Sequence, residues 1–270
     1  MIDPKLQAEL RERFNPDDSI LRRHQLRMLD MLKYIDKICQ ENKIPYWLSS
    51  GTCLGAVRHG GFIPWDDDVD IEMLKSDYSR FKQIMDESTG NNVVFQTHDS
   101  DSEYFAPYGK IRDLRSIIEE GNSHDRYYKY RGVYIDVFAI EPSTSRLITR
   151  ISGGMQSRLQ YPLSKIRNRV MRKLTTNIMY IILSRFIYPI FSLITCRKSS
   201  RILRHIHGSG FVGPRYCKDL FPLTYISFEG CLFPVPNNYQ HYLSAIYGDY
   251  MKIPELSKIQ THLSNVILNP

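Results

Sequence analysis

The feature of this sequence that most constrains its fold is an acidic run inside an apolar stretch, IPWDDDVDIEML, at residues 63–74. Asp66, Asp67, Asp68 and Asp70 lie within five positions, and apolar residues continue on either side. Like charges repel, and a half-buried strand cannot keep such groups ionised unless something positive neutralises them. The chain must therefore either leave this run in solvent as a loop or build a cation site around it.

Length and composition describe a globular protein. The 270 residues, 42% of them hydrophobic, are sufficient for a packed core. The N-terminus is charged and has no apolar run before a small-residue cleavage site, which predicts a cytoplasmic protein. The five cysteines have no CxxC spacing, so we expect reduced thiols rather than a zinc cluster or a disulfide framework.

Positive charge is concentrated in one section. Residues 142–218 contain 15 Lys or Arg and no Asp or Glu, whereas the rest of the chain has 21 basic and 29 acidic residues. The section includes an apolar run at residues 178–195, which Arg185 and Pro189 interrupt. A central Arg costs about 2.5 to 3.5 kcal/mol in a membrane-spanning helix. We therefore expect a buried or surface-lying helical hairpin rather than a spanning helix.

The mixture of basic and long apolar residues in this section also indicates its partner. No nucleic-acid-binding motif accompanies the charges, so we expect no nucleic acid. Attraction to anionic lipids, worth about 1 kcal/mol per basic residue near the surface, fits the pattern better. We predict a peripheral protein on the inner face of the cytoplasmic membrane, with a simply solvated basic surface as the alternative.

Local patterns predict an α+β fold, with a mixed β-sheet core, flanking helices and a helical cationic insertion. Residues 1–145 are expected to form the N-terminal part of the catalytic core, 146–218 the insertion and 219–270 the part that completes the core. Helices are predicted at 18–41, 53–60, 76–88, 146–210 and 238–247, and strands at 46–49, 69–74, 92–98, 106–113, 132–140 and 225–236.

The acidic run and its surroundings predict a site for phosphate and metal. On a strand, residues i and i+2 share one face, so Asp68 and Asp70 project together, in a geometry that suits one or two divalent cations. Upstream, Gly51 and Thr52 lie at a strand-to-helix junction, where free backbone N–H groups favour a phosphate.

A third carboxylate, Asp136, lies in the apolar strand VYIDVFAI and therefore needs a cation or a donor. Together these residues indicate phosphoryl-group transfer assisted by two metals, about 3.5 to 4 Å apart. Asp136 is then the ligand nearest the attacking hydroxyl and helps to remove its proton. For Asp66 and Asp67, a solvated turn after Pro64 is the simpler interpretation.

The run SSGTCLGAVRHGGFIPWDDDVDIEM closely resembles the signature of the LicD family. The stretches YGKIRD, GVYIDVFAIEP and FEGCLFPVPNNYQHYLSAIYGDYMKIPE agree as well, so the similarity spans roughly residues 18–255 and is weak only in the cationic middle. The sequence departs from the common pattern at Cys53 and at DVFAIEP, and neither departure changes a proposed ligand.

The resemblance implies a nucleotidyltransferase-type fold and an Mg²⁺- or Mn²⁺-dependent transfer. The transferred group is phosphocholine from CDP-choline, or a related group from a CDP-alditol as in the fukutin type. The acceptor is a hydroxyl of a cell-surface glycan such as lipopolysaccharide, teichoic acid or capsule, in free or lipid-linked form. By position, Gly51 and Thr52 match the phosphate-binding turn, and Asp68, Asp70 and Asp136 the metal ligands. Lys110 and Arg112 match a segment that could bind the donor phosphates.

Several further residues have a functional and a structural interpretation. Arg58 could reach a phosphate or close the Gly60-Gly61 turn. Trp65 could form an aromatic cage for a quaternary ammonium with Tyr104, Phe105 and Tyr108, or all four could pack in the core. Glu229, in an apolar strand, requires an ion pair with Arg or Lys or a role in the site.

Two other functions are compatible with the same residues. A nucleotidyltransferase that moves a nucleoside monophosphate from an NTP and releases pyrophosphate could use the same turn and aspartates. A catalytically idle scaffold at the membrane surface could keep the same fold, but it should lack a ligand, and none of the proposed ligands is missing.

Overall fold

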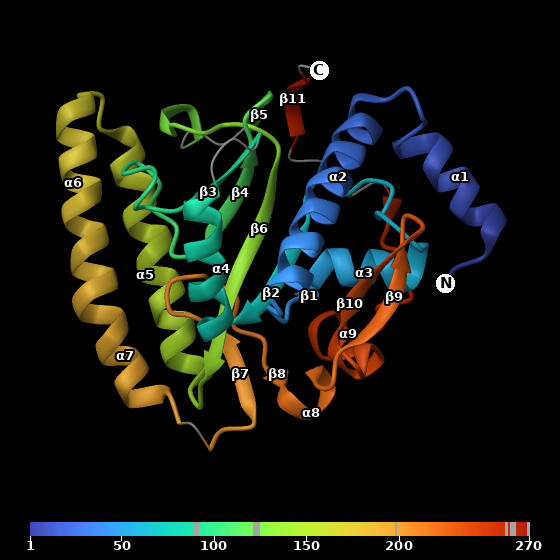
Figure 1. Cartoon of the computed structure of the whole chain (residues 1–270). Helices are drawn as coiled ribbons and strands as arrows, with labels where there is room; N and C mark the ends of the chain where they lie inside the picture. Colours follow the sequence, from blue (N-terminus) through green and yellow to red (C-terminus); the bar gives the residue numbers. More distant parts are fainter. Residues whose placement is uncertain (89–91, 121–124, 198, 257–258, 260–262, 269–270) are drawn as a thin grey trace.

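A mixed β-sheet forms the centre of the molecule (Figure 1). The computed structural model describes residues 1–88, 92–120, 125–197, 199–256, 259 and 263–268. Within these residues the sheet has seven strands in the order β1-β2-β6-β4-β3, and β7 pairs with β6 and with β8. Their bounds are Trp47–Leu48 (β1), Asp70–Leu74 (β2), Val93–Gln96 (β3), Gly109–Asp113 (β4), Tyr134–Pro142 (β6), Ile202–His205 (β7) and Arg215–Tyr216 (β8).

β6 is the strand around which the sheet is organised. β2 runs parallel along one edge of β6, whereas β4 and then β7 pair antiparallel along the other edge. Ile135, Val137 and Ile140 of β6 are completely buried, as expected for a strand with both faces covered. Parallel and antiparallel pairs in one sheet with flanking helices confirm the α+β class that the sequence predicts.

The predicted N-terminal helix is present as α2, Ile20–Glu41. Ser19 caps it, because the Ser19 hydroxyl accepts a hydrogen bond from the backbone N–H of Arg22 at 3.0 Å. Apolar residues recur at spacings of three and four along the helix, and Leu32 and Ile35 are completely buried in the main core. This helix therefore supplies much of the apolar support behind the sheet.

Two other helices begin earlier than the sequence predicts. α3 spans Ser50–His59 rather than residues 53–60, so Gly51 lies in its first turn. α4 spans Lys75–Glu87 and begins one residue before the predicted cap, Ser76, with no side-chain cap at its N-terminus. Both helices follow strands so closely that tertiary packing, rather than a capping side chain, sets where they start.

Most of the cationic segment, residues 142–218, forms a helical layer beside the sheet, at the left of Figure 1. The layer consists of α5 (Arg146–Lys165), α6 (Arg169–Ile181), a π-helical turn (Ile182–Ile187) and α7 (Tyr188–Thr195). The prediction of helix as far as residue 210 is wrong, because β7 and β8 pair with the central sheet. The last residue of β6, Pro142, lies opposite Leu203 of β7. The helical layer therefore connects two strands that are neighbours in the sheet.

The outward face of α6 and α7 is apolar, and the inward face is held by polar contacts and by an apolar cluster that includes Leu183 and Tyr188. Arg172 forms an ion pair with Glu103 at 2.8 Å, and Asn177 Oδ1 lies 2.9 Å from His98 Nε2. The stretch 169–195 is long and apolar enough to cross a membrane by length and composition, and 17% of its most apolar window is buried. The exposed residues, here named the apolar stripe, are Val170, Met171, Leu174, Ile178, Ile181, Ile182, Phe186, Ile190, Leu193 and Ile194.

The remaining elements lie around the other parts of the sheet (Figure 1). The predicted C-terminal helix is confirmed as α9, and the predicted strand region is a hairpin of β9 and β10. Glu229, in the turn of that hairpin, forms an ion pair with Arg22 at 2.7 Å. The bounds are Pro4–Phe14 (α1), Ser116–Glu120 (β5), Asp125–Tyr127 (a 3₁₀ turn), Cys217–Leu220 (α8), Thr224–Phe228 (β9), Cys231–Val235 (β10), Tyr239–Tyr247 (α9) and Leu263–Leu268 (β11).

Candidate active site

Three neighbouring strands place two acids and a lysine in one row across the sheet. Asp70 at the start of β2 lies opposite Asp136 of β6, and Asp136 lies opposite Lys110 of β4. The Lys110 Nζ is 2.9 Å from an Asp136 carboxylate oxygen. The pairing register of the sheet therefore brings together residues that are far apart in the sequence.

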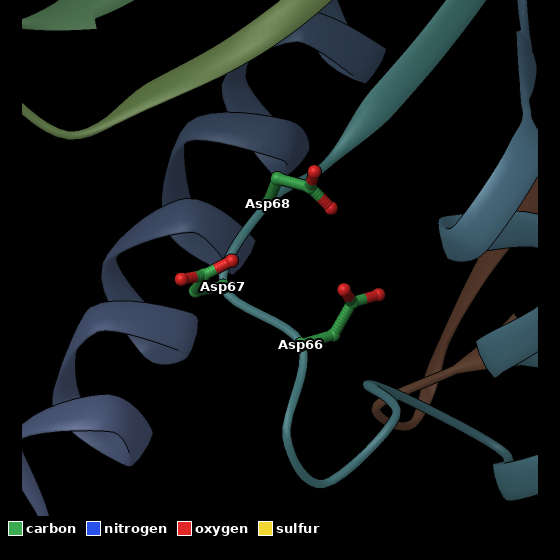
Figure 2. Close-up of side chains that lie close together, drawn as sticks. All are labelled: Asp66, Asp67 and Asp68. Carbon is green, nitrogen blue, oxygen red and sulfur yellow. The ribbon is translucent and has the colours of Figure 1, made fainter. Parts of the chain in front are cut away.

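The loop before β2 adds further carboxylates to this row. Ligand atoms of Asp66, Asp67 and Asp68 all lie within 4.8 Å of one another. Figure 2 shows that the Asp66 and Asp68 carboxylates extend to one side of the loop, whereas that of Asp67 extends toward the neighbouring helix. Asp66, Asp68, Asp70 and Asp136 line one cleft. Asp66 thus belongs to the acidic cluster, although a solvated turn is the simpler interpretation of its sequence.

The cluster carries more negative charge than the surrounding side chains balance. Burial raises the pKa of Asp66 and of Asp70 well above the ordinary value, and neighbouring carboxylates, Asp68 first among them, raise it further. Asp70 forms no ion pair with any residue that the structure describes. The charge of Lys110 lowers the pKa of Asp70, but it only partly offsets the effect of burial and of the neighbouring acids. A divalent cation would relieve this repulsion, and hard oxygen ligands are the donors that Mg²⁺ and Mn²⁺ prefer. The carboxylates present therefore fit a metal.

Positive side chains line the same cleft, whose volume is about 610 Å³. Arg215 is buried and forms an ion pair with Glu72 at 2.6 Å, so its position is fixed. Arg146, in the first turn of α5, is exposed and pairs with no acid in the described part of the chain. Two guanidinium groups near four carboxylates suit a ligand that carries both phosphate and metal.

The start of α3 forms another part of the cleft wall. Gly51 lies there, and a Cβ at this position would come within 3.1 Å of an Asp66 carboxylate oxygen. The Thr52 hydroxyl instead accepts a hydrogen bond from the backbone N–H of Asp70 at 2.8 Å. Gly51 therefore allows close approach to the acids, and Thr52 holds the first residue of β2.

Besides Thr52 and Lys110, three more of the predicted site residues are not among those that line the cleft. Arg58 is buried and donates to the backbone oxygen of Tyr250 at 2.8 Å. Arg112 is 1% exposed, and its guanidinium donates to Gln96 Oε1 and to a backbone oxygen. Trp65 packs against the Phe14 ring with centroids 5.3 Å apart. Their polar and aromatic groups are used in packing the fold.

The sequence does not indicate several other residues that line the cleft. Arg146 and Arg215 belong to the section interpreted as an insertion, and only its high positive charge could have indicated them. Tyr247, the last residue of the predicted helix 238–247, also lines the cleft. Burial and the charges of Asp70 and Asp66 raise the pKa of Tyr247, so its phenol stays protonated beside the acids.

The part of the chain that carries the acidic row also matches a family of known proteins. Residues 43–176 match the family model described as LicD/FKTN/FKRP, nucleotidyltransferase domain. The matched range contains every carboxylate of the cleft named above. The predicted resemblance to the LicD family is therefore confirmed.

Similarity to individual proteins extends over different parts of the chain. The lipopolysaccharide cholinephosphotransferase LicD of Haemophilus influenzae is 29% identical over 250 residues, which is 87% of this chain and 92% of that protein. The human ribitol 5-phosphate transferase FKRP is 36% identical over 61 residues, 23% of this chain and 12% of that protein. The human ribitol-5-phosphate transferase FKTN is 26% identical over 129 residues, 48% of this chain and 23% of that protein.

Proposed function

The chain carries a LicD-family domain, and from this premise we propose that the protein is a transferase that moves a phospho-substituent to a glycan. The finer proposal is metal-dependent transfer of phosphocholine from CDP-choline to a hydroxyl of a cell-surface glycan. The name of the Haemophilus influenzae relative supports phosphocholine as the transferred group, because the similarity covers most of both chains. An alditol phosphate from a CDP-alditol is the alternative, supported by the shorter matches to ribitol-phosphate transferases.

One observation carries this proposal: four carboxylates and two arginines line a single cleft. Acids alone would suit a cation, and arginines alone would suit an anion. Their combination suits a nucleoside-diphosphate donor bound together with a metal. The description of the matched domain also supports a nucleotidyltransferase-type arrangement of the central sheet.

We assign the metal to Asp68, Asp70 and Asp136, and we add Asp66 because it lines the same cleft. When bound, Mg²⁺ or Mn²⁺ would neutralise phosphate oxygens and stabilise charge on the attacking and leaving oxygens. The raised pKa values of Asp66 and Asp70 support this assignment, since repulsion between these acids favours binding of a cation.

Other groups of this chain would bind the donor and accept a proton. Asp136 is oriented by Lys110 at 2.9 Å and is the carboxylate to which the acceptor hydroxyl would lose its proton. Arg146, exposed at the cleft and without an acidic partner among the described residues, would bind a donor phosphate. Gly51 would allow the phosphates to lie close to the start of α3.

The apolar stripe supports a peripheral position on the inner face of the cytoplasmic membrane. A helix of a soluble protein turns its apolar face inward, but α6 and α7 leave Leu193 84% exposed and Phe186 62% exposed. Polar contacts such as that of Arg172 with Glu103 hold the inward face on the body of the protein, which favours a helix lying on the membrane over one crossing it. Neighbouring basic residues complement anionic lipid.

Mass spectrometry of the products tests the proposed reaction. Purified protein is incubated with Mg²⁺ or Mn²⁺ and separately with CDP-choline, CDP-ribitol, CDP-glycerol and CTP, with a glycan extract as acceptor. Metal-dependent release of CMP from one CDP donor is expected, and the identity of that donor shows which group is transferred. Pyrophosphate from CTP would instead support transfer of a nucleoside monophosphate, and no product from any of the four would contradict both reactions.

Flotation with vesicles tests the membrane position. The parent protein is expected to float with vesicles that contain anionic phosphatidylglycerol and to lose most of this binding when Phe186 and Leu193 are changed to Ser. Substitution of Leu6 and Leu114, two exposed leucines outside the stripe, is the matched control. Equal flotation of both variants would argue against the apolar stripe as the lipid-binding face.

A further inference from the structure

A second cavity adjoins the cleft, and the two share part of their walls. This cavity, of about 300 Å³, is lined by four tyrosines and is here named the tyrosine chamber: Tyr104, Tyr108, Tyr128 and Tyr134. Tyr108 and Asp136 line both the chamber and the cleft. A ligand in the cleft and a ligand in the chamber can therefore both contact Asp136.

The walls of the chamber are mostly polar. Besides the tyrosines they include Gln156, Gln160, Ser157 and Ser209, together with Asp125, Lys110 and Asp136. Hydroxyl, amide and carboxylate groups can donate or accept hydrogen bonds, and the tyrosine rings offer apolar faces. This combination suits a neutral polyhydroxylated ligand such as a sugar. A volume at the lower end of the range for ligand pockets is suited to one residue rather than a long chain.

The position of Lys110 argues against a quaternary ammonium in this chamber. The Lys110 ammonium lies 3.4 Å from the centre of the Tyr134 ring and 6.0 Å from that of Tyr108. These aromatic faces are thus already occupied by a cation of the protein itself. A second cation would meet repulsion from Lys110, whereas a hydroxyl group would not.

The side of the chamber away from the sheet comes from the cationic segment. Ser157 and Gln160 belong to α5, and Ser209 follows β7, whereas Asp136 and Lys110 belong to the central sheet. Asp136 and Lys110 of the sheet thus share the chamber with residues of the cationic segment that have no part in the row of acids.

We propose that the tyrosine chamber binds the acceptor, a single sugar or alditol residue of a glycan, and that the cationic segment selects it. This proposal rests on the proposed function, in which the donor occupies the cleft. The acceptor oxygen forms a bond to the donor phosphorus that carries the transferred group, while the bond from that phosphorus to the bridging oxygen breaks. That electron pair leaves with CMP, and the hydroxyl proton passes to the Asp136 carboxylate.

Saturation-transfer NMR on the full chain tests the assignment. A panel of methyl glycosides, ribitol and glycerol is mixed with the protein, CMP and Mg²⁺, and the aromatic protons of the protein are irradiated. At least one glycoside or alditol is expected to receive saturation, because tyrosine rings line the chamber. Absence of binding by the whole panel would overturn the assignment.

Two variants and a control locate that binding. Ser157→Phe narrows the chamber, and Gln160→Leu removes an amide at nearly constant volume; each is expected to weaken binding of the glycoside at least about tenfold, or 1.4 kcal/mol. Arg158→Phe puts the same ring on the exposed residue next to Ser157, outside the chamber, and should leave binding unchanged. Equal binding by the parent and all three variants would overturn the assignment.

A separate titration distinguishes failure of the two proposals. CMP and CDP-choline are titrated into the parent protein without glycoside. If a glycoside binds at the chamber but neither nucleotide binds at the cleft, the chamber assignment holds and the proposed donor is wrong. If nucleotides bind and the glycoside signal is insensitive to Ser157→Phe and Gln160→Leu, the proposed function holds and the chamber assignment is wrong.

Discussion

Asp70 and Glu72 are two positions apart on the same strand and the same face of the sheet, yet their surroundings are opposite. Glu72 is completely buried and accepts hydrogen bonds from Trp47 Nε1 at 2.9 Å and from Arg215 at 2.6 Å. Burial alone would raise the pKa of Glu72, but Arg215 and His205 outweigh it and lower the value to about 2. Burial and neighbouring acids raise the pKa of Asp70.

The difference separates a carboxylate that supports the fold from one that serves a ligand. The protein supplies Glu72 with enough positive charge and donors to keep it ionised, whereas Asp70 has no ion pair with a described residue. Titratable groups whose pKa is strongly shifted, as that of Asp70 is, cluster at functional sites. Of these two residues of one strand, Glu72 therefore contributes to the stability of the fold, and Asp70 contributes to the proposed chemistry.

The largest expected effect is on catalysis. Asp70→Asn removes a proposed metal ligand at nearly constant volume and should lower the rate of CMP release at least about 1,000-fold, with the fold intact. Asp67→Asn is the matched control, because Asp67 does not line the cleft and its side chain lies toward the neighbouring helix (Figure 2); its rate should stay close to that of the parent. A rate for Asp70→Asn within threefold (roughly 0.7 kcal/mol) of the parent would refute the assignment.

The second effect is on stability. Glu72→Gln leaves the buried Arg215 guanidinium without its charged partner and should lower the free energy of unfolding by about 3 to 5 kcal/mol. Urea denaturation followed by circular dichroism measures it. The exposed Glu87→Gln on α4 should change it by less than about 0.5 kcal/mol. A loss for Glu72→Gln no larger than that of Glu87→Gln would show that Glu72 does not hold the sheet.

The third effect is a dependence of stability on pH. Because the pKa of Asp70 is raised in the folded state, its contribution to stability is complete below the ordinary value of 3.8 and is lost as pH rises toward the folded-state pKa. Metal-free parent should therefore lose stability relative to Asp70→Asn by up to about 1.4 kcal/mol per pH unit in that window. Mg²⁺ should restore the parent more than the variant. A difference that does not change with pH would contradict this.

The smallest effect extends the comparison to the arginines of the cleft. Arg215 is committed to Glu72, but Arg146 has no acidic partner among the described residues. Arg146→Ala should raise the KM for the CDP donor about tenfold, with little change in unfolding, because a single charge-assisted contact to phosphate is lost. Arg150→Ala, at an exposed position one turn further along α5, is the control. Equal KM values for both variants would remove Arg146 from the donor site.

The sequence predicted the elements that local patterns specify. The helix from Ile20 and the strand containing Asp136 follow from apolar spacing and agree with the structure. The grouping of Asp68 with Asp70 follows from the two-residue period of a strand, although β2 itself begins only at Asp70. Their juxtaposition with Asp136 could be anticipated because a buried carboxylate needs a partner.

Features that depend on distant pairing could not be predicted. Arg215 reaches the cleft because β7 and β8 join the sheet, a pairing that no local pattern in the cationic segment indicates. Asp66 joins the acids through the course of a loop, which apolar periodicity does not describe. Arg112 looked available for phosphate, but its partner Gln96 comes from the adjacent strand and leaves the guanidinium buried.

The connection between β6 and β7 has a consequence for how such proteins diversify. Pro142 and Leu203 are opposite each other in an antiparallel pair, so the whole helical layer is topologically the loop of one β-hairpin. The entropy cost of closing a loop grows slowly with its length, so layers of different size can be exchanged there without a change of strand register. A different loop at this hairpin would change the residues that line the tyrosine chamber and leave the carboxylates of the central sheet in place.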